Sequence, residues 1–123
     1  MKIIKFEDLD CWQESRVLTG DIYKITSNGL LKKDFGLVDQ MRRAAMSIMA
    51  NIAEGFSRQG DREFTQFLFI SKASASELQS HLYVALDQGH IDQEYFQSLY
   101  NQLESIQKRI SNLIKYLKSS SKT

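Results

Sequence analysis

The sequence predicts an all-α protein, an antiparallel up-down-up-down four-helix bundle, and three observations support this fold class. The 123-residue chain has no proline and only six glycines, which favours long helices joined by short turns. Four stretches show helical periodicity, and no stretch alternates as a β-strand does. Apolar residues make up 42% of the chain and charged residues 25%, a balance typical of globular domains. We therefore expect one domain over residues 1–123, with helices at about 8–27, 37–58, 61–87 and 92–118.

Glycine and aspartate mark the expected helix ends. Gly29 and Gly89 follow the first and third helices, where glycine tolerates the left-handed backbone of a C-cap. Residues 30–36 are expected to form a connection. Asp61 and Asp92 are the expected N-caps of the third and fourth helices, because a carboxylate accepts hydrogen bonds from free amide groups.

The second helix carries the most apolar surface. One of its stripes holds Met41, Ala44, Ala45, Ile48, Ile52 and Phe56, and a second stripe beside it holds Met46, Met49 and Ala53. A helix that is apolar over most of its circumference is normally packed against several neighbours. We therefore expect this helix at the centre of the protein.

The fourth helix has the most regular pattern. Its apolar residues follow a 3-4 spacing over three heptads: Phe96, Leu99, Leu103, Ile106, Ile110, Leu113 and Leu117. Such a spacing gives a straight seam for packing in a bundle.

Some apolar residues lie outside the stripes that one bundle can bury. Phe69 and Ile70 fall off the main stripe of the third helix, and Met46, Met49 and Ala53 form the surplus stripe of the second. Each helix of a four-helix bundle has one inner face, so surplus apolar faces need another partner. These five residues are our candidates for an interface between subunits.

Polar residues near the apolar faces form a second candidate group, a buried hydrogen-bonded network that fixes helix register. Its expected members are Ser47, Asn51, Glu54, Ser71 and Glu77, with Ser74 beside them. The alternative interpretation is a small active site. Glu77 and His81 form an i, i+4 pair, but a di-iron bundle needs two Glu-x-x-His motifs and two further glutamates.

No spacing in the chain indicates catalysis. The sequence has no glycine-rich phosphate loop, no Ser/His/Asp constellation and no readable pair of catalytic carboxylates. We therefore expect no metal and no cofactor, and we expect that the protein is not an enzyme. His90, beside a glycine, is interpreted as a solvated turn residue.

The net charge of +1 does not indicate a strongly basic nucleic-acid binder, but the charges are unevenly distributed. The candidate nucleic-acid contacts are Arg42, Arg43, Arg58, Arg62 and Lys72. Arginine suits phosphate because its planar fork binds two oxygens at once. The alternative is that these cations pair with carboxylates of the chain, for example Arg43 with Glu54. Any binding should be directed at the backbone and sensitive to salt.

Location follows from what the sequence lacks. No apolar run approaches the roughly 20 residues of a membrane-spanning helix, and the N-terminus has no signal-peptide core. The single cysteine, Cys11, cannot form a disulfide within the chain. We expect a cytoplasmic protein that does not associate with membranes.

Three segments carry a resemblance to a known family: FEDLDCWQ at 6–13, GLVDQMRRAAMSIMANIAEGFSR at 36–58 and EFTQFLFISKASASELQSHLYVALDQGHID at 63–92. Together they resemble the four-helix-bundle proteins encoded within intervening sequences of bacterial 23S rRNA genes, formerly named ribosomal proteins. The accessory protein of diversity-generating retroelements is similar. One departure is Met49, where the family usually has proline, so the second helix should be straighter here.

The resemblance implies a homopentamer that is associated with RNA or other nucleic acid. The accessory relatives act beside a reverse transcriptase, which is therefore a further possible partner. The resulting hypothesis is a non-enzymatic, homo-oligomeric scaffold or accessory protein that contacts nucleic acid through arginine. The alternative hypothesis is an adaptor that binds another polypeptide and no nucleic acid.

Overall fold

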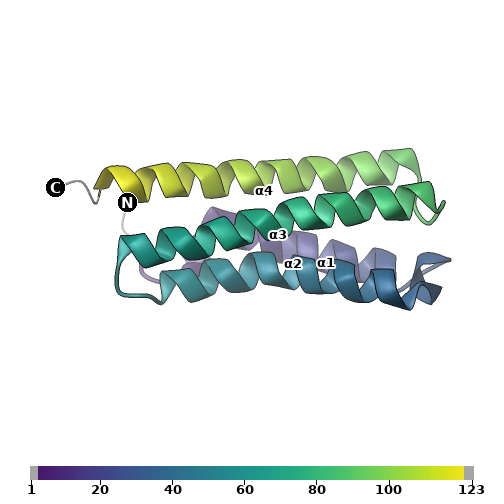
Figure 1. The fold of residues 1–123 in the computed structure, drawn as a ribbon, viewed down its shortest axis with the longest axis horizontal. Helices are drawn as coiled ribbons and strands as arrows, with labels where there is room; N and C mark the ends of the chain where they lie inside the picture. The colour runs from purple at the N-terminus through teal and green to yellow at the C-terminus, as the bar shows by residue number, and fades with distance from the viewer. Residues whose placement is uncertain (1–2, 121–123) are drawn as a thin grey trace.

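The computed structural model describes residues 3–120, which form four long α-helices and two short 3-10 helices. Consecutive long helices run in opposite directions, and the start of α1 lies at the same end as the end of α4 (Figure 1). The bounds are η1 Phe6–Asp8, α1 Asp10–Thr26, η2 Leu31–Lys33, α2 Phe35–Phe56, α3 Asp61–Asp87 and α4 Gln93–Ser120. The predicted all-α antiparallel four-helix bundle is therefore confirmed.

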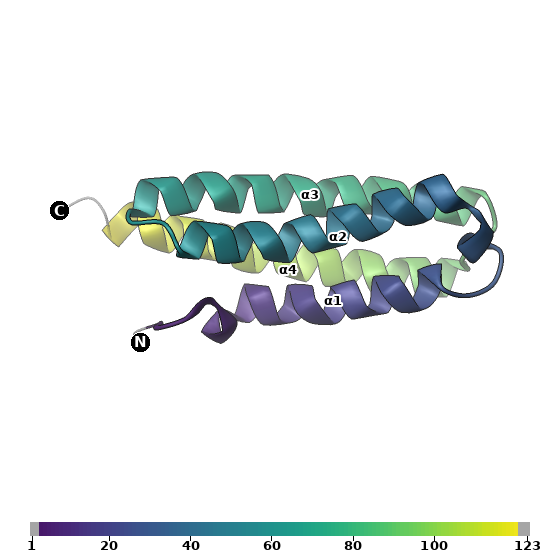
Figure 2. The ribbon, with the colours of Figure 1, turned by 90° about the horizontal axis from the view of Figure 1, so that it is seen from below.

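Each helix packs against two others. The order around the bundle is α1, α2, α3 and α4, and α4 returns to α1; Figure 2 shows α1, α2 and α3 in this sequence, with α4 behind them. Leucine and isoleucine fill the centre, with fully buried side chains that include Leu18, Ile22, Ile48, Ile52, Leu68, Leu78, Leu82, Leu103 and Ile106. Burying such a side chain contributes about 1.5–3 kcal/mol, so this core supplies most of the stabilisation.

Small residues let α2 and α3 approach closely. Ala44, Ala45 and Ala75 are fully buried, and the Ser71 hydroxyl donates to the Ile48 carbonyl across the two helices at 2.7 Å. Gly55 is the extreme case. A Cβ placed there would lie 2.7 Å from the Cβ of Phe67, a separation that real Cβ atoms do not adopt. The glycine is therefore required by the contact between the helices.

Turn residues fix the helix ends. Gly29 and Gly89 have positive φ angles of 63° and 74°. Gly89 directly follows Gln88, the C-cap of α3, whereas Gly29 lies two residues past Ser27, the C-cap of α1. The Asp92 carboxylate accepts from the Tyr95 amide at 2.7 Å and caps α4, as predicted. The Asp34 carboxylate accepts from the Leu37 amide and caps α2, a cap not predicted from the sequence.

The observed helix bounds differ from the approximate expected ones by one or two residues at several ends. The second helix begins at Phe35 instead of residue 37, because Asp34 caps it. The first helix begins at Asp10 instead of residue 8, because Phe6–Asp8 forms a separate 3-10 turn. The fourth helix continues to Ser120, past the expected end at 118.

Two residue assignments also need correction. Asp61 is not an N-cap: Gly60 holds that position without a side-chain hydrogen bond, and the Asp61 carboxylate instead accepts from the Ser120 hydroxyl. In α4 the buried position after Ile110 is Ile114, whereas Leu113 is only partly buried. The seam takes a second step of four residues there, because the helix repeats every 3.6 residues and not every 3.5.

Across residues 3–120, none of the helices is both long enough and apolar enough to cross a membrane.

Candidate functional site

Exposed apolar side chains form two patches on the bundle. The first, which we call the α2 patch, consists of Tyr23, Met46, Met49 and Ala53. Met46 is 44% exposed, and Met49 and Ala53 are half-buried. The Tyr23 hydroxyl donates to the Met46 sulfur at 3.6 Å and Thr19 donates to the Met49 sulfur at 3.5 Å, so the patch faces the α1 side of α2.

The second patch, which we call the α3 patch, consists of Phe69 and Ile70; Tyr83 and Val84 are also exposed but lie about 21 Å further along α3. The exposed fractions of these four side chains lie between 43% and 50%. The Lys118 ammonium lies 5.3 Å from the centre of the Phe69 ring, and the Tyr83 ring packs 4.7 Å from that of Phe96. Because Lys118 belongs to α4, the α3 patch extends toward the α4 side of α3, and Tyr83 contacts α4 separately, nearer the other end of the helix.

The two patches lie at matching heights along the bundle. Ser47 and Ser74 are joined by a 2.8 Å hydrogen bond between their hydroxyls, and Ser71 bonds to the Ile48 carbonyl. Residues 46–49 of α2 therefore run beside residues 70–74 of α3. The patches sit level with each other, on opposite sides of the α2–α3 pair.

A polar seam lies between α2 and α3. The Asn51 amide donates to both the carbonyl and the hydroxyl of Ser47, at 2.8 and 3.0 Å, and Ser47 bonds to Ser74. Ser71 is fully buried. These bonds pair the hydroxyls and the Asn51 amide inside the helix contact, which fixes how α2 and α3 align.

The two glutamates predicted in this network are placed differently. The side chain of Glu54 is 53% exposed and pairs with Arg58 at 2.9 Å, so the prediction of a buried residue was wrong. Glu54 lies near the end of α2, where its long side chain reaches solvent. Glu77 is 38% exposed and binds Arg43 at 3.0 Å and His81 at 3.3 Å. Its carboxylate is therefore part of a surface ion-pair cluster.

The predicted arginines are mostly engaged by groups of their own chain. Arg43 pairs with Glu77 and Arg58 pairs with Glu54, so the alternative interpretation, that these cations pair with carboxylates of the chain, holds for both, although the partner of Arg43 is not Glu54. Arg42 donates to the hydroxyl of Thr26 at 2.9 Å and stacks over Tyr23, with its guanidinium carbon 4.3 Å from the ring centre.

Arg62 and Lys72 differ from these three. Within residues 3–120, neither side chain takes part in an ion pair or a hydrogen bond. Arg62 is exposed in the first turn of α3, and Lys72 is half-buried beside α4. The structure therefore does not bring the five predicted contacts together on one surface.

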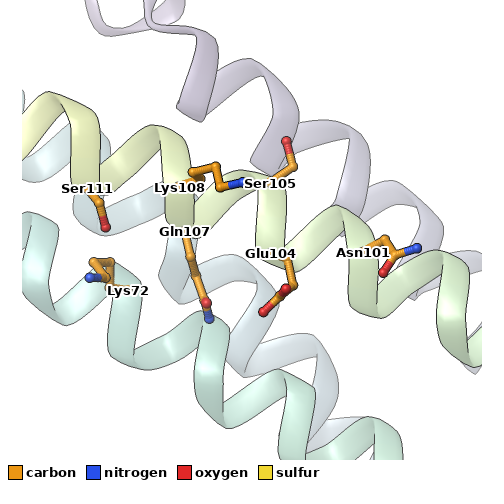
Figure 3. Close-up of a pocket in the computed structure, with 7 residues that line it drawn as sticks. All are labelled: Lys72, Asn101, Glu104, Ser105, Gln107, Lys108 and Ser111. Atoms are coloured by element: carbon orange, nitrogen blue, oxygen red, sulfur yellow. The ribbon is translucent and has the colours of Figure 1, made fainter.

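Lys72 lies at the edge of a groove between α3 and α4 (Figure 3). The groove has a volume of about 520 Å³ and a polar lining: Lys72, Asn101, Glu104, Ser105, Gln107, Lys108 and Ser111. Lys72 comes from α3 and the other lining residues from α4 (Figure 3). Glu104 is the one acidic residue of this lining.

Arg109 shows how a cation of α4 can be neutralised. It binds Asp10 at 2.7 Å and Glu14 at 3.1 Å and so joins α4 to α1. The hydrogen bond to Asp10, with the nearby charge of Glu14, raises the pKa of Arg109 above its usual value. This guanidinium is already committed to two carboxylates of its own chain.

His90 is a residue that sequence reasoning misjudged. Its side chain is only 14% exposed, and Nε2 lies 3.1 Å from the Asp34 carboxylate, so it is not a solvated turn residue. The Nδ1 atom of His90 is buried and has no hydrogen-bond partner among residues 3–120. The partner is 56 residues away in the chain. No local pattern could have indicated the contact.

The structure offers no obvious reactive group in its described part. Burial raises the pKa of the Cys11 thiol to about 12, so the thiol stays protonated at neutral pH and is a poor nucleophile. Glu77 and His81 do form the expected pair. In residues 3–120, however, no three histidine, cysteine or acidic side chains are grouped in a way that could hold a metal ion.

Comparison with known proteins identifies the family. The model of the 23S rRNA-intervening sequence protein family matches residues 7–112, which is most of the chain. The chain belongs to this family. The match covers all of α1, α2 and α3 and most of α4, so it includes both apolar patches and the groove.

A solved structure of the same kind agrees with this assignment. It is the crystal structure of a protein of unknown function from the S23 ribosomal protein family of Bacteroides thetaiotaomicron VPI-5482. The two chains are 28% identical, with a TM-score of 0.78, over 85% of this chain and 98% of the other. None of the curated proteins matches this chain significantly.

Proposed function

We propose that this protein is a cytoplasmic, non-enzymatic scaffold that assembles into a homo-oligomer, expected to be a pentamer, and associates with RNA or other nucleic acid. The observation that carries the proposal is the pair of exposed apolar patches at equal height on opposite sides of α2 and α3. Exposed apolar patches of this kind mark interaction sites on soluble proteins.

The position of the patches favours a ring over a two-fold dimer. In a two-fold dimer one patch meets its own copy, and a second, distinct patch remains uncovered. When two different patches meet, each subunit presents the α2 patch to one neighbour and the α3 patch to the other. Because the two patches have the same height, each contact adds a rotation without a shift along the axis of the assembly. Such contacts close into a ring instead of growing as a helical filament.

Two arguments support association with nucleic acid: the name of the family, and the repetition of basic residues in every subunit of an oligomer. The family is named for intervening sequences of 23S rRNA. One chain has a net charge of only +1, but a ring repeats each basic residue in every subunit. Several phosphate contacts are needed for measurable binding, and repetition supplies them.

The experiment combines a mass measurement with a binding titration. By light scattering, we expect a particle of five times the 14.2 kDa chain mass at micromolar concentration. By fluorescence anisotropy, we expect binding to two unrelated 20-nucleotide RNAs at 50 mM salt, with similar affinity and a steep loss as salt increases. A monomer would contradict the assembly.

The alternative function is an adaptor for another polypeptide. The ion pairs of Arg43 and Arg58 favour it, because they leave fewer free cations for phosphate than the sequence suggested. An oligomer that ignores both RNA and DNA at low salt would exclude the scaffold for nucleic acid and leave the adaptor.

A further inference from the structure

Lysines line one side of the bundle along α3 and α4. We call the set Lys72, Lys108, Lys115 and Lys118 the lysine ridge. Residues 108, 115 and 118 share one face of α4 because their spacings of seven and three residues are close to whole turns. Lys72 of α3 and Lys108 of α4 line the same groove, together with Ser111 (Figure 3).

The lysine ridge differs from the arginines in being largely free. In the described residues 3–120, no ion pair or hydrogen bond engages Lys72, Lys108 or Lys115. Lys118 packs over the Phe69 ring and is therefore partly committed. Arg43, Arg58 and Arg109, by contrast, each bind a carboxylate.

Acidic residues of the neighbouring face do not neutralise the ridge. Asp10 and Glu14 are bound to Arg109, and Asp21 accepts from Gln102, all on the α1 side of α4. Glu104 lines the same groove as Lys72 and Lys108, and the Asp61 carboxylate accepts from Ser120 near the end of α4. In and beside the groove, Lys72, Lys108 and Lys115 against Glu104 leave a local positive excess in a chain whose net charge is only +1.

We propose that the lysine ridge binds the phosphate backbone of nucleic acid. This inference rests on the proposed association with nucleic acid and names the surface that carries it. Lysine binds phosphate as a point charge, and the Ser111 hydroxyl and the Asn101 amide are further donors to phosphate oxygens. Such contacts position a strand without reading its sequence.

The length of the ridge fits several phosphates. Residues 108 to 118 of α4 rise by about 15 Å, at 1.5 Å per residue. One strand of B-form DNA presents a phosphate about every 3.4 Å along its axis, so the ridge spans about four of them.

Lys118 touches Phe69 of the α3 patch, and Lys72 lies about one helical turn from Phe69, so this part of the ridge borders the proposed contact between subunits. Lys108 and Lys115 belong to α4, which contributes no residue to either patch, so assembly would leave them accessible.

The test compares two triple variants with the same change in charge. The ridge variant is Lys72→Gln, Lys108→Gln and Lys115→Gln, and Lys118 is kept because it touches Phe69. The control variant is Lys24→Gln, Lys32→Gln and Lys33→Gln, three exposed lysines near the opposite end of the bundle. Circular dichroism and light scattering verify that both variants keep the wild-type fold and mass.

Binding is measured by anisotropy with a labelled 20-nucleotide RNA, as a single strand and as a duplex, between 50 and 300 mM salt. We expect the ridge variant to bind at least about tenfold more weakly at 50 mM salt, with a salt slope shallower by about 2 on the single strand. The control variant should bind RNA less than about threefold more weakly than the wild type does. The two RNA forms show which backbone geometry the ridge accepts.

Three outcomes would overturn the inference in distinguishable ways. A wild-type protein that binds neither RNA form removes the proposed function and the ridge together. If the ridge variant binds RNA like the wild type, or if the control variant loses as much affinity as the ridge variant, only the inference about the lysine ridge is wrong. Displacement of RNA by an acidic peptide at equal charge concentration would assign the ridge to a protein partner.

Discussion

At the scale of single residues, Gly55 is the most constrained of the six glycines. An added Cβ would meet Phe67 Cβ at 2.7 Å, Phe64 Cδ1 at 2.9 Å and the Phe64 carbonyl at 3.2 Å. Two of these atoms are backbone or Cβ atoms, which cannot move without shifting α3. We expect Gly55→Ala to lower the free energy of unfolding by about 1–3 kcal/mol, as overpacking does.

Gly20 provides the matched control. It also lies inside a helix, but a Cβ there would have no atom within 4 Å. Gly20→Ala should raise the free energy of unfolding by about 0.5–1 kcal/mol, because alanine favours the helix. Urea unfolding at one protein concentration measures both variants. Equal effects of the two substitutions would show that the α2–α3 contact does not depend on Gly55.

Residue contacts were the part of the structure that sequence reasoning reached least. The sequence indicates that Arg43 can pair with a carboxylate, but it does not show which one. The partner, Glu77, lies 34 residues away, and Glu54 was an equally reasonable candidate. The pairing of His90 with Asp34 spans 56 residues. Which charge meets which depends on how helices align in space, and periodicity within one helix carries no such information.

At the scale of elements, the helix starts separate two aspartates that looked alike in the sequence. Asp92 caps α4 through the Tyr95 amide, whereas Asp61 is already inside α3 and caps nothing. We expect Asp92→Ala to lower the free energy of unfolding by about 0.5–2 kcal/mol. Asp61→Ala should cost at most about half as much, because it loses only an exposed bond to Ser120 and a favourable charge at the helix start.

Chemical denaturation of the two aspartate variants, under identical conditions, decides the matter. If Asp61→Ala proved as costly as Asp92→Ala, the assignment of Gly60 as the N-cap of α3 would be wrong. Helical wheels cannot make this distinction, since both aspartates follow a turn and precede an apolar stripe.

Element identity, by contrast, was predictable almost completely. Four periodic stretches became four helices, and the ends near Gly29 and Gly89 fell where glycine permits a positive φ. The errors lie at the starts of α2 and α3, where the Asp34 cap was missed and Asp61 was taken for a cap, and near Leu113. A strict heptad kept Leu113 in the seam, whereas a straight helix turns Ile114 inward instead.

At the scale of the whole molecule, the surplus of apolar residues was predictable but its full extent was not. Phe69 and Ile70 were singled out by their position off the main stripe, whereas Tyr83 and Val84 were not. Val84 follows Ile70 by 14 residues, close to four helical turns, so the same face was readable from the spacing. That the two patches share one height follows only from the α2–α3 hydrogen bonds.

The central claim is that the α2 patch of one subunit meets the α3 patch of the next, and a mixing experiment tests it most directly. Met46→Asp spoils only the α2 patch and Ile70→Asp only the α3 patch, and both side chains are about half exposed, so each variant should fold. In each variant one contact surface stays intact. When one variant is alone in solution, every molecule lacks the patch that this intact surface would contact.

The decisive measurement is the mass of the two variants by light scattering, first alone and then in an equimolar mixture. We expect each variant alone to be a monomer of 14.2 kDa, and the mixture to form a one-to-one heterodimer that grows no further. A mixture that remains monomeric, or a variant that keeps the wild-type mass, would contradict the account.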